Sequence, residues 1–311
     1  MSENNGSTNY AISEASLKLD HRKTLILGAS GLLGKAILNR FSIEAGASEK
    51  IYTIPWSEIR NPDVGSDVHR LTMCLEEKLG DMADCDIIVA SGLINSTDSE
   101  QLRYSNLEFP RNLIQVASKY PGSRCMTFGT IHERFDAAVS HNAYFMSKYL
   151  LSQWISDFSR QQHPSSGKIL HLRLHTLYGL PLHPRMFLGQ IAEALKSGFP
   201  FKMSSGEQLR EYHHAEDIAE CVFRLFQKEW HTVPGAVLEI NSGEAVRLRN
   251  LATAIFREFK REDLLQIGDV PASEGENKTE IFRRSDSDIL PYSREPITGV
   301  IDTLRRHLKS G

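Results

Sequence analysis

The chain has 311 residues, of which 41% are hydrophobic and 24% are charged, and its formal net charge is −3. This is the composition of an ordinary globular protein with one large or two closely packed domains, and it has no basic field that would favour nucleic acid. The four cysteines show no metal or redox spacing, and no apolar run reaches the length needed to span a bilayer. We therefore expect a cytoplasmic protein with no metal, no nucleic-acid partner and no membrane insertion.

Residues 1–21 are polar and are expected to form a flexible tail. Beyond them, apolar runs that predict strands alternate with amphipathic segments that predict helices. The strands are expected from 23, at 50–56, 85–92, 123–130 and 168–179, and the helices after the first strand, at 106–120 and from 142 onward. This alternation predicts a doubly wound parallel α/β sheet.

The pattern changes after Gly179, where helices dominate and strands become short. The late helices are expected within 180–201, 216–229, 248–259 and 297–308, and a short strand at 236–243. Residues 266–280 are polar and rich in turn formers, so we expect an exposed loop there.

Three glycines, Gly28, Gly31 and Gly34, separate the first strand from the first helix in the segment GASGLLG. Glycines at such a turn allow the backbone to approach a phosphate closely, and the helix N-terminus supplies N–H groups and a positive dipole for it. The segment therefore predicts a dinucleotide-binding turn, with a tight turn that binds nothing as the alternative.

A second candidate site lies in HNAYFMSKYLL, where Tyr144 precedes Lys148 by four residues. On a helix these positions share one face. A lysine there can lower the pKa of the phenol and make it a usable proton donor and acceptor. The alternative is a half-buried tyrosine beside a solvated lysine.

The two sites together resemble the extended branch of the short-chain dehydrogenase/reductase superfamily, the NAD-dependent epimerase/dehydratase group. Asn106 matches the asparagine that opens a family helix, RLHTLYG matches Arg-x-x-Asn-x-Tyr-Gly with Thr176 in place of asparagine, and SGEQLREYHHAEDIAE matches a later segment. The resemblance covers roughly residues 22–308 and is nearest to the 4-keto-sugar reductases of the abequose and paratose synthase type. It implies a nucleotide-sugar substrate and a homodimer formed through a helix bundle that includes the Tyr144–Lys148 helix.

The resemblance also implies a domain organisation. A Rossmann-type dinucleotide-binding domain would occupy residues 22–179, with a return segment near 212–243. A smaller, discontinuous substrate-binding subdomain would comprise residues 180–211 and 244–311.

By the same resemblance, Thr130 at the end of the strand expected at 123–130 would hydrogen-bond the reacting oxygen, with Thr127 as the alternative. Tyr144 would be the general acid or base. Lys148 would lower the pKa of Tyr144 and bind the nicotinamide ribose. The resemblance assigns these residues to the cofactor: Gly28, Ser30, Gly31, Leu32, Leu33, Gly34, Ala90, Ser91, Gly92, Asn106 and Lys148.

The second expected strand ends at Pro55 and Trp56, where NAD enzymes of this kind carry an acid for the ribose. Ser57 and Arg60 follow, and an arginine at this place suits a 2′-phosphate. We therefore expect NADP as the cofactor, with NAD as the alternative. The competing interpretation is that these side chains are solvated loop residues that do not bind the cofactor.

The resemblance assigns the substrate pyrophosphate to Arg210 and to Arg283 or Arg284, because guanidinium groups bind phosphates in a bidentate manner. Surface arginines are the alternative. His132, Thr176 and Arg185 are expected to line the same cleft, whereas His214 and Asp217 are expected to be structural.

Three reactions remain open. Family dehydratases follow the catalytic threonine with Asp-Glu, and here Ile131 and His132 stand there. The sequence favours reduction of a 4-keto-6-deoxy nucleotide sugar over dehydration. A nucleotide-sugar 4-epimerase with tightly bound NAD and a non-catalytic dinucleotide-binding regulatory protein stay as alternatives.

Overall fold

The structure, a computed structural model, describes residues 22–44, 50–59, 66–94, 96–135, 139–140, 142–163, 166–228, 230, 236–271 and 282–309. The expected N-terminal tail, Arg60 and most of the expected 266–280 loop lie outside these residues. No helix in the described ranges is long and apolar enough to cross a membrane.

A six-stranded sheet with the order β2-β1-β3-β4-β5-β9 forms the centre of the fold, and each neighbouring pair is parallel. Its strands are β1 (Lys23–Leu27), β2 (Lys50–Ile54), β3 (Asp86–Val89), β4 (Arg124–Thr130), β5 (Lys168–Leu174) and β9 (Val237–Glu239). The order reverses beside β1, as in doubly wound folds, so the predicted sheet is confirmed.

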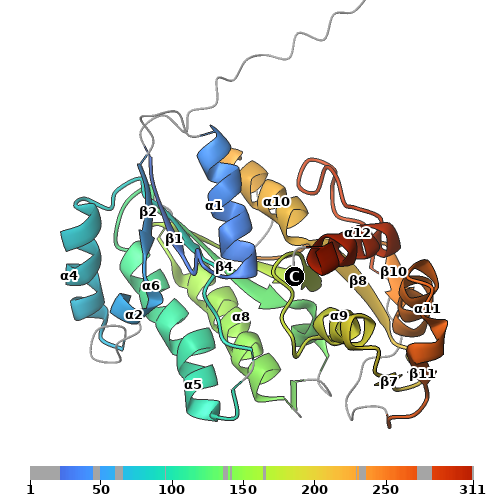
Figure 1. Cartoon of the computed structure of the whole chain (residues 1–311). Helices are drawn as coiled ribbons and strands as arrows, with labels where there is room; N and C mark the ends of the chain where they lie inside the picture. The colour runs from blue at the N-terminus through green and yellow to red at the C-terminus, as the bar shows by residue number, and fades with distance from the viewer. Residues whose placement is uncertain are drawn as a thin grey trace, which may run out of the picture.

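Helices cover both faces of this sheet (Figure 1). One face is covered by α1 (Leu32–Glu44) and α10 (Ala215–Gln227), which pack on each other. The other face carries α4 (Val68–Leu79), α6 (Phe109–Ala117) and α8 (Ala143–Gln161). Successive side chains of a strand point to opposite faces. Leu25 and Leu27 of β1 therefore lie in the core under α4, α6 and α8, whereas Ile26 lies in the core under α1 and α10.

Further helices and strands form a separate part of the molecule with a third apolar core, at the right of Figure 1. Its helices are α9 (Phe187–Ser197), α11 (Leu248–Glu258) and α12 (Pro296–Lys309), with the short turn η4 (Glu262–Leu264). Its strands are β6 (Thr176–Tyr178), β7 (Phe201–Met203), β8 (Leu209–His214), β10 (Ala245–Arg247) and β11 (Leu265–Ile267). They form the sheets β10-β8-β6 and β11-β7. We propose that this part is the substrate-binding subdomain, with the boundaries inferred above.

Several predicted elements differ from the structure in their bounds. The strand expected at 168–179 is two strands, because β5 continues the central sheet and β6 pairs with β8. The strand expected at 50–56 ends at Ile54, since Pro55 has no N–H for a ladder, and the short helix α2 (Trp56–Ile59) follows. The first residues of the expected 266–280 loop belong to β11, which pairs with β7.

The helix expected from Asn106 begins earlier. Asp98 caps α5 (Ser99–Arg103), and a π-helical turn, η1 (Tyr104–Glu108), joins α5 to α6. Helix α4 was not predicted, although Asp67 caps it and leucines recur along its buried face every four residues.

Candidate active site

The glycine turn between β1 and α1 has the shape that a pyrophosphate needs. A Cβ atom on Gly28 would lie 2.5 Å from the backbone nitrogen of Ser91, and one on Gly34 would lie 2.1 Å from the carbonyl oxygen of Gly28. Gly28 also has a φ of +82°, which favours glycine. The first N–H groups of α1, at Leu32 and Leu33, lack partners within the helix and point out of its N-terminus. These features fit a bound dinucleotide, and the buried Oγ of Ser91 has no hydrogen-bond partner among the described residues.

The loop after β3 is fixed against this turn by Asn106. The Asn106 side chain accepts a hydrogen bond from the backbone N–H of Leu93 (3.0 Å) and donates one to its carbonyl oxygen (2.8 Å). A Cβ on Gly92 would lie 3.1 Å from Asn106 Oδ1 and 3.4 Å from Lys148 Nζ. The structure therefore brings Gly92, Asn106 and Lys148 together, and gives Asn106 a positioning role for the loop.

The candidate catalytic residues meet where β4 ends and α8 begins. Thr130 is the last residue of β4, and Asn142 caps α8 so that Tyr144 lies in its first turn. One turn later, Lys148 donates a hydrogen bond from Nζ to the carbonyl oxygen of Phe128 in β4 (2.9 Å). Thr127, the alternative to Thr130, is 1% exposed and hydrogen-bonded to His171, so it is a core residue.

The protonation of this site differs from the sequence-based expectation. Burial, and secondarily the charge of Glu133, raise the pKa of Tyr144 above its ordinary value. Burial lowers the pKa of Lys148 to about 8, an effect that the charge of Glu133 opposes. The expectation that Lys148 lowers the pKa of Tyr144 is therefore wrong for the protein by itself, because a desolvated phenol near a carboxylate holds its proton.

Glu133 is a residue that the sequence analysis missed. It lies in η2 (Ile131–Arg134), and its fully buried carboxylate accepts hydrogen bonds from the backbone N–H of Thr130 (2.7 Å) and from Nε of Arg173 (2.9 Å). Its Oε2 also lies 3.5 Å from His171 Nε2. A Cβ on Gly129 would clash with Glu133 Oε1 at 2.0 Å, so the glycine makes room for the carboxylate. Its spacing three residues after Thr130 is that of a capping box, which could have revealed it.

The described residues that follow β2 include one carboxylate, Glu58. Ser57 and Glu58 are exposed in α2, and Glu58 is bound to Lys78 Nζ at 2.6 Å. Arg60 lies outside the described residues.

Two of the residues expected to bind substrate lie on β6 and β8. Thr176 is in β6 and Arg210 is in β8. His132 stacks on Phe145 with ring centroids 4.6 Å apart, beside Tyr144. Burial lowers the pKa of His132 to about 4, with the nearby Arg210 adding to the effect, so the ring is neutral at pH 7.

The remaining expected arginines differ in setting. Arg283 and Arg284 are both exposed, and Arg284 donates a hydrogen bond to the carbonyl oxygen of Ser242 (3.2 Å). Arg185 is exposed in the loop before α9, where its backbone N–H bonds His183. His214 caps α10 by accepting from the backbone N–H of Glu216, which matches its expected structural role.

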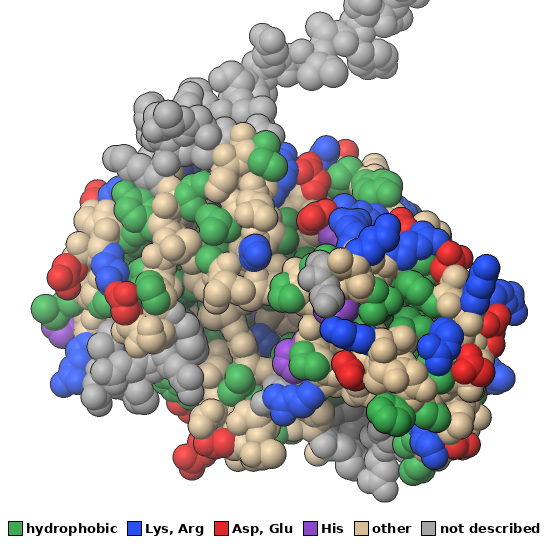
Figure 2. Space-filling view, in the orientation of Figure 1, with side chains coloured by type: hydrophobic (Ala, Val, Ile, Leu, Met, Phe, Trp, Pro, Cys, Tyr) green, Lys and Arg blue, Asp and Glu red, His purple; other side chains and the backbone are tan. Residues whose placement is uncertain are grey.

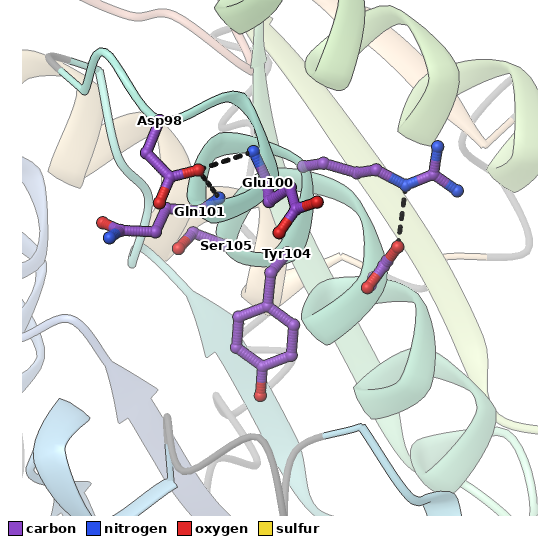
Figure 3. Close-up of a pocket in the computed structure, with 7 residues that line it drawn as sticks. Asp98, Glu100, Gln101, Tyr104 and Ser105 are labelled. Atoms are coloured by element: carbon purple, nitrogen blue, oxygen red, sulfur yellow. Dashed lines mark hydrogen bonds and ion pairs between the residues drawn. The ribbon is translucent and has the colours of Figure 1, made fainter.

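A cavity of about 690 Å³ shares no lining residue with the candidate triad. Figure 3 shows that its lining comes from α5 and η1, with Asp98 capping α5 at the backbone N–H groups of Glu100 and Gln101. Its acidic lining suits neither a pyrophosphate nor a nicotinamide, so it is no candidate for the reaction. No group of three His, Cys, Asp or Glu residues within the described ranges could hold a metal ion.

Comparison with known proteins agrees with this geometry. A model of the NAD dependent epimerase/dehydratase family matches residues 24–240, more than half of the chain. An ADP-L-glycero-D-manno-heptose-6-epimerase of Nitratidesulfovibrio vulgaris (strain DP4) is 24% identical, with 91% of this chain and 97% of that protein aligned.

Two solved structures illustrate the shared fold. The UDP-glucuronic acid 4-epimerase of Bacillus cereus, in complex with NAD and a fluorinated UDP-sugar, has a TM-score of 0.73 at 16% identity and covers 93% of this chain and 99% of its own. MoeE5 in complex with UDP-glucose and NAD has a TM-score of 0.70 at 17% identity and covers 92% and 99%. With a glycine turn, a Rossmann-like sheet and a family match over most of that sheet, the chain belongs to the NAD dependent epimerase/dehydratase family.

Proposed function

We propose that the chain is an NAD(P)-dependent oxidoreductase of nucleotide sugars that reduces a 4-keto-6-deoxy nucleotide sugar. The observation that carries the proposal is the phenol of Tyr144 in the first turn of α8, which is the candidate proton donor among the residues that the structure describes. Tyr144 is protonated at neutral pH, Ile131 is a buried hydrocarbon, and the Glu133 carboxylate is turned into the protein beneath β4. Elimination of water needs both an acid and a base next to the sugar, whereas ketone reduction needs one proton.

The residues would act as follows. Thr130 and Tyr144 hydrogen-bond the carbonyl oxygen of the substrate, and Tyr144 delivers a proton to it as charge develops. Lys148 binds the ribose beside the nicotinamide, and Gly28, Gly31 and Gly34 accommodate the pyrophosphate. The reduced nicotinamide supplies the hydride when it is bound. Arg210 and Arg284 bind the pyrophosphate of the nucleotide sugar.

NADP is the proposed cofactor, and NAD is the alternative, which is the molecule named with the solved relatives. The argument for NADP is that Glu58, the acid that follows β2 within the described range 50–59, is paired with Lys78. Fluorescence titration should give tighter binding of NADPH than of NADH, and Arg60→Ala should narrow the difference. A preference for NADH would contradict the proposal.

An epimerase is the second candidate, favoured by the name of the curated relative. Its chemistry uses the same tyrosine and returns the hydride to the substrate. The two reactions differ in net use of cofactor. A panel of nucleotide sugars, followed by absorbance of the reduced cofactor and by chromatography, should show stoichiometric oxidation of NADPH. Interconversion of epimers without net change in cofactor would support the epimerase instead.

The decisive variant is Tyr144→Phe, with Tyr149→Phe on the next turn of α8 as the matched control. Removing the proton donor should lower turnover by ~10²–10⁴-fold, while the control keeps its activity. A non-catalytic dinucleotide-binding protein would show no turnover in the native chain or in either variant. Turnover by Tyr144→Phe equal to that of the native chain would refute the assignment.

We also propose that two copies pair through α5 and α8. Met146 and Leu150 on α8 are exposed, and α5 packs beside α8. Sedimentation should show the native chain as a dimer and a Leu150→Glu variant as a monomer. A dimeric variant would contradict this pairing.

A further inference from the structure

A small cavity of about 20 Å³ lies next to the candidate triad, between the end of β4 and strand β8. Its lining includes His132, His175, Arg210 and Glu211. Figure 2 shows this face of the molecule hollowed between the sheet and the C-terminal helices, with histidine and basic side chains at the edge of the hollow. A volume of this size holds one water molecule or one small substituent of a ligand.

Glu211 lines this cavity, and its carboxylate has one bound oxygen and one unbound oxygen. Its Oε2 accepts hydrogen bonds from the backbone N–H (2.6 Å) and the hydroxyl (2.9 Å) of Ser242, and from Nε2 of His213 (3.2 Å). Its Oε1 is buried and has no hydrogen-bond partner among the described residues, although the side chain is only 1% exposed. A buried carboxylate oxygen without a partner is costly, so a ligand that donates to it would gain affinity.

The surrounding histidines fix this carboxylate without filling its free position. The ring of His175 donates from Nε2 to the side-chain oxygen of Asn241 (2.8 Å), and the same Nε2 lies 3.7 Å from Glu211 Oε2. The rings of His175 and His213 lie 5.3 Å apart. Both histidines therefore contact the anchored side of the carboxylate.

Glu211 stays ionised in this setting. Burial opposes ionisation, but the hydrogen bonds from His213 and Ser242 and the charge of His175 outweigh it and hold the pKa of the carboxyl below its ordinary value. An ionised carboxylate is only an acceptor, so the group that it binds must be a donor. The buried Nδ1 of His132, on another wall of the cavity, also has no hydrogen-bond partner among the described residues. A hydroxyl suits this pair, because it can donate to the carboxylate and also accept a hydrogen bond.

We propose that this cavity is a sugar subsite in which Glu211 accepts a hydrogen bond from one hydroxyl group of the substrate. The inference rests on the proposed function, since the subsite lies beside Thr130 and Tyr144 on the side where Arg210 projects. It makes Glu211 a specificity-determining residue. A sugar with a carboxylate or a hydrogen at that position binds poorly, the first through repulsion and the second by leaving the oxygen unpaired.

The test begins with the full-length protein and saturating NADPH. Binding of UDP-, dTDP-, GDP- and ADP-glucose is measured by calorimetry to choose the preferred nucleotide. Deoxyfluoro analogues of that nucleotide sugar, substituted at one sugar position at a time, are then titrated. Fluorine has nearly the size of a hydroxyl but cannot donate a hydrogen bond. We expect one analogue to lose about 10-fold or more in affinity, the scale of a hydrogen bond to a charged group.

The same titrations with Glu211→Gln locate the partner of the lost hydrogen bond. The glutamine oxygen keeps the contact with Ser242 and its NH₂ group faces the cavity, so the acceptor becomes a donor with little change in shape. The loss in affinity caused by fluorine at the one sensitive position, the fluorine penalty, should then disappear. Two changes whose effects on affinity do not add in this way act on the same contact. Glu207→Gln, the same change at an exposed carboxylate in the loop before β8, should keep the native pattern.

Each other outcome has a distinct meaning. If Glu211→Gln does not fold, Glu211→Asp serves instead, because it keeps the charge but withdraws it by one methylene, and it should weaken the native sugar without a fluorine penalty. Equal fluorine penalties in the native and variant proteins would overturn the subsite while leaving the proposed function intact. If no nucleotide sugar binds, including a 4-keto-6-deoxy nucleotide sugar, the proposed function itself is refuted, and the subsite with it.

Discussion

Removal of the buried Glu133 carboxylate should affect both folding and the protonation of the site. The carboxylate holds the backbone N–H of Thr130 and the guanidinium of Arg173, and it lies near His171. In Glu133→Ala these groups lose their shared partner. In Glu133→Gln an acceptor oxygen stays available for Thr130, and the side chain keeps its shape but loses its charge.

The magnitude follows from burial. The Arg173 side chain is 15% exposed and would keep only Glu239 and the hydroxyl of Ser152 as partners. Breaking a buried ion pair by removing one member costs about 3–5 kcal/mol. This is a large part of the about 5–15 kcal/mol by which a domain is stable. Glu133→Gln should cost about 1–3 kcal/mol, because its oxygen can still accept from Thr130 but its NH₂ group replaces the oxygen that accepted from Arg173 Nε.

Urea unfolding at pH 7, followed by tryptophan fluorescence, measures both values. Glu239→Gln is the control, since Glu239 binds the same arginine at a partly exposed position and should cost no more than about 1 kcal/mol. Glu133 also raises the pKa of Lys148 and of Tyr144, so Glu133→Gln should move both titrations to lower pH. A Glu133→Ala variant as stable as the Glu239→Gln control would show that the buried network contributes little and that this reasoning is wrong.

Three further predictions concern the cofactor site and pH. Gly28→Ala should abolish dinucleotide binding, because the added Cβ would lie 2.5 Å from Ser91 N and the turn must shift, and near-native affinity in a fluorescence titration would contradict the assigned turn. NADPH binding should weaken as the pH rises through about 8, the pKa of Lys148, since the charged ammonium is a stronger hydrogen-bond donor to the ribose than the neutral amine, and Lys148→Met should remove that dependence. Burial lowers the pKa of His132 to about 4 from 6.5. As the pH falls, the unfolded chain therefore binds a proton at this histidine before the folded chain does, and the free energy of unfolding decreases between pH 6.5 and about 4. The loss for this group is about 3 kcal/mol at most. His132→Phe should flatten the pH dependence of urea unfolding, and an unchanged slope would show that another group causes it.

The parts of the fold that the sequence predicted are those with local causes. The glycine turn depends on backbone freedom and close approach within a few residues, and Tyr144 and Lys148 share a face because of helical spacing. Both features are therefore readable from short segments. The assignment of Thr130 over Thr127 has structural support of the same kind, since alternate residues of a strand point to opposite sides.

The parts that the sequence missed depend on distant partners. The run at 168–179 is apolar throughout, and only the pairing of β6 with β8 shows that it changes sheet. Likewise, the charge of Glu133 is retained inside the protein because Arg173, far along the chain, reaches it. The sequence alone could not show that Glu133, rather than Lys148, acts on the pKa of Tyr144.

The raised pKa of Tyr144 bears on the direction of the proposed reaction. A phenol that retains its proton is ready to donate it to a ketone, but it must first lose that proton before it can take one from an alcohol. An epimerase must perform both steps in each cycle, with the tyrosine acting first as base and then as acid. The buried charge of Glu133 opposes the first of these steps and leaves the second available. Burial of the phenol, and secondarily the charge of Glu133, therefore act in the direction that the proposed reduction requires, and the test is whether Glu133→Gln moves the Tyr144 titration to lower pH.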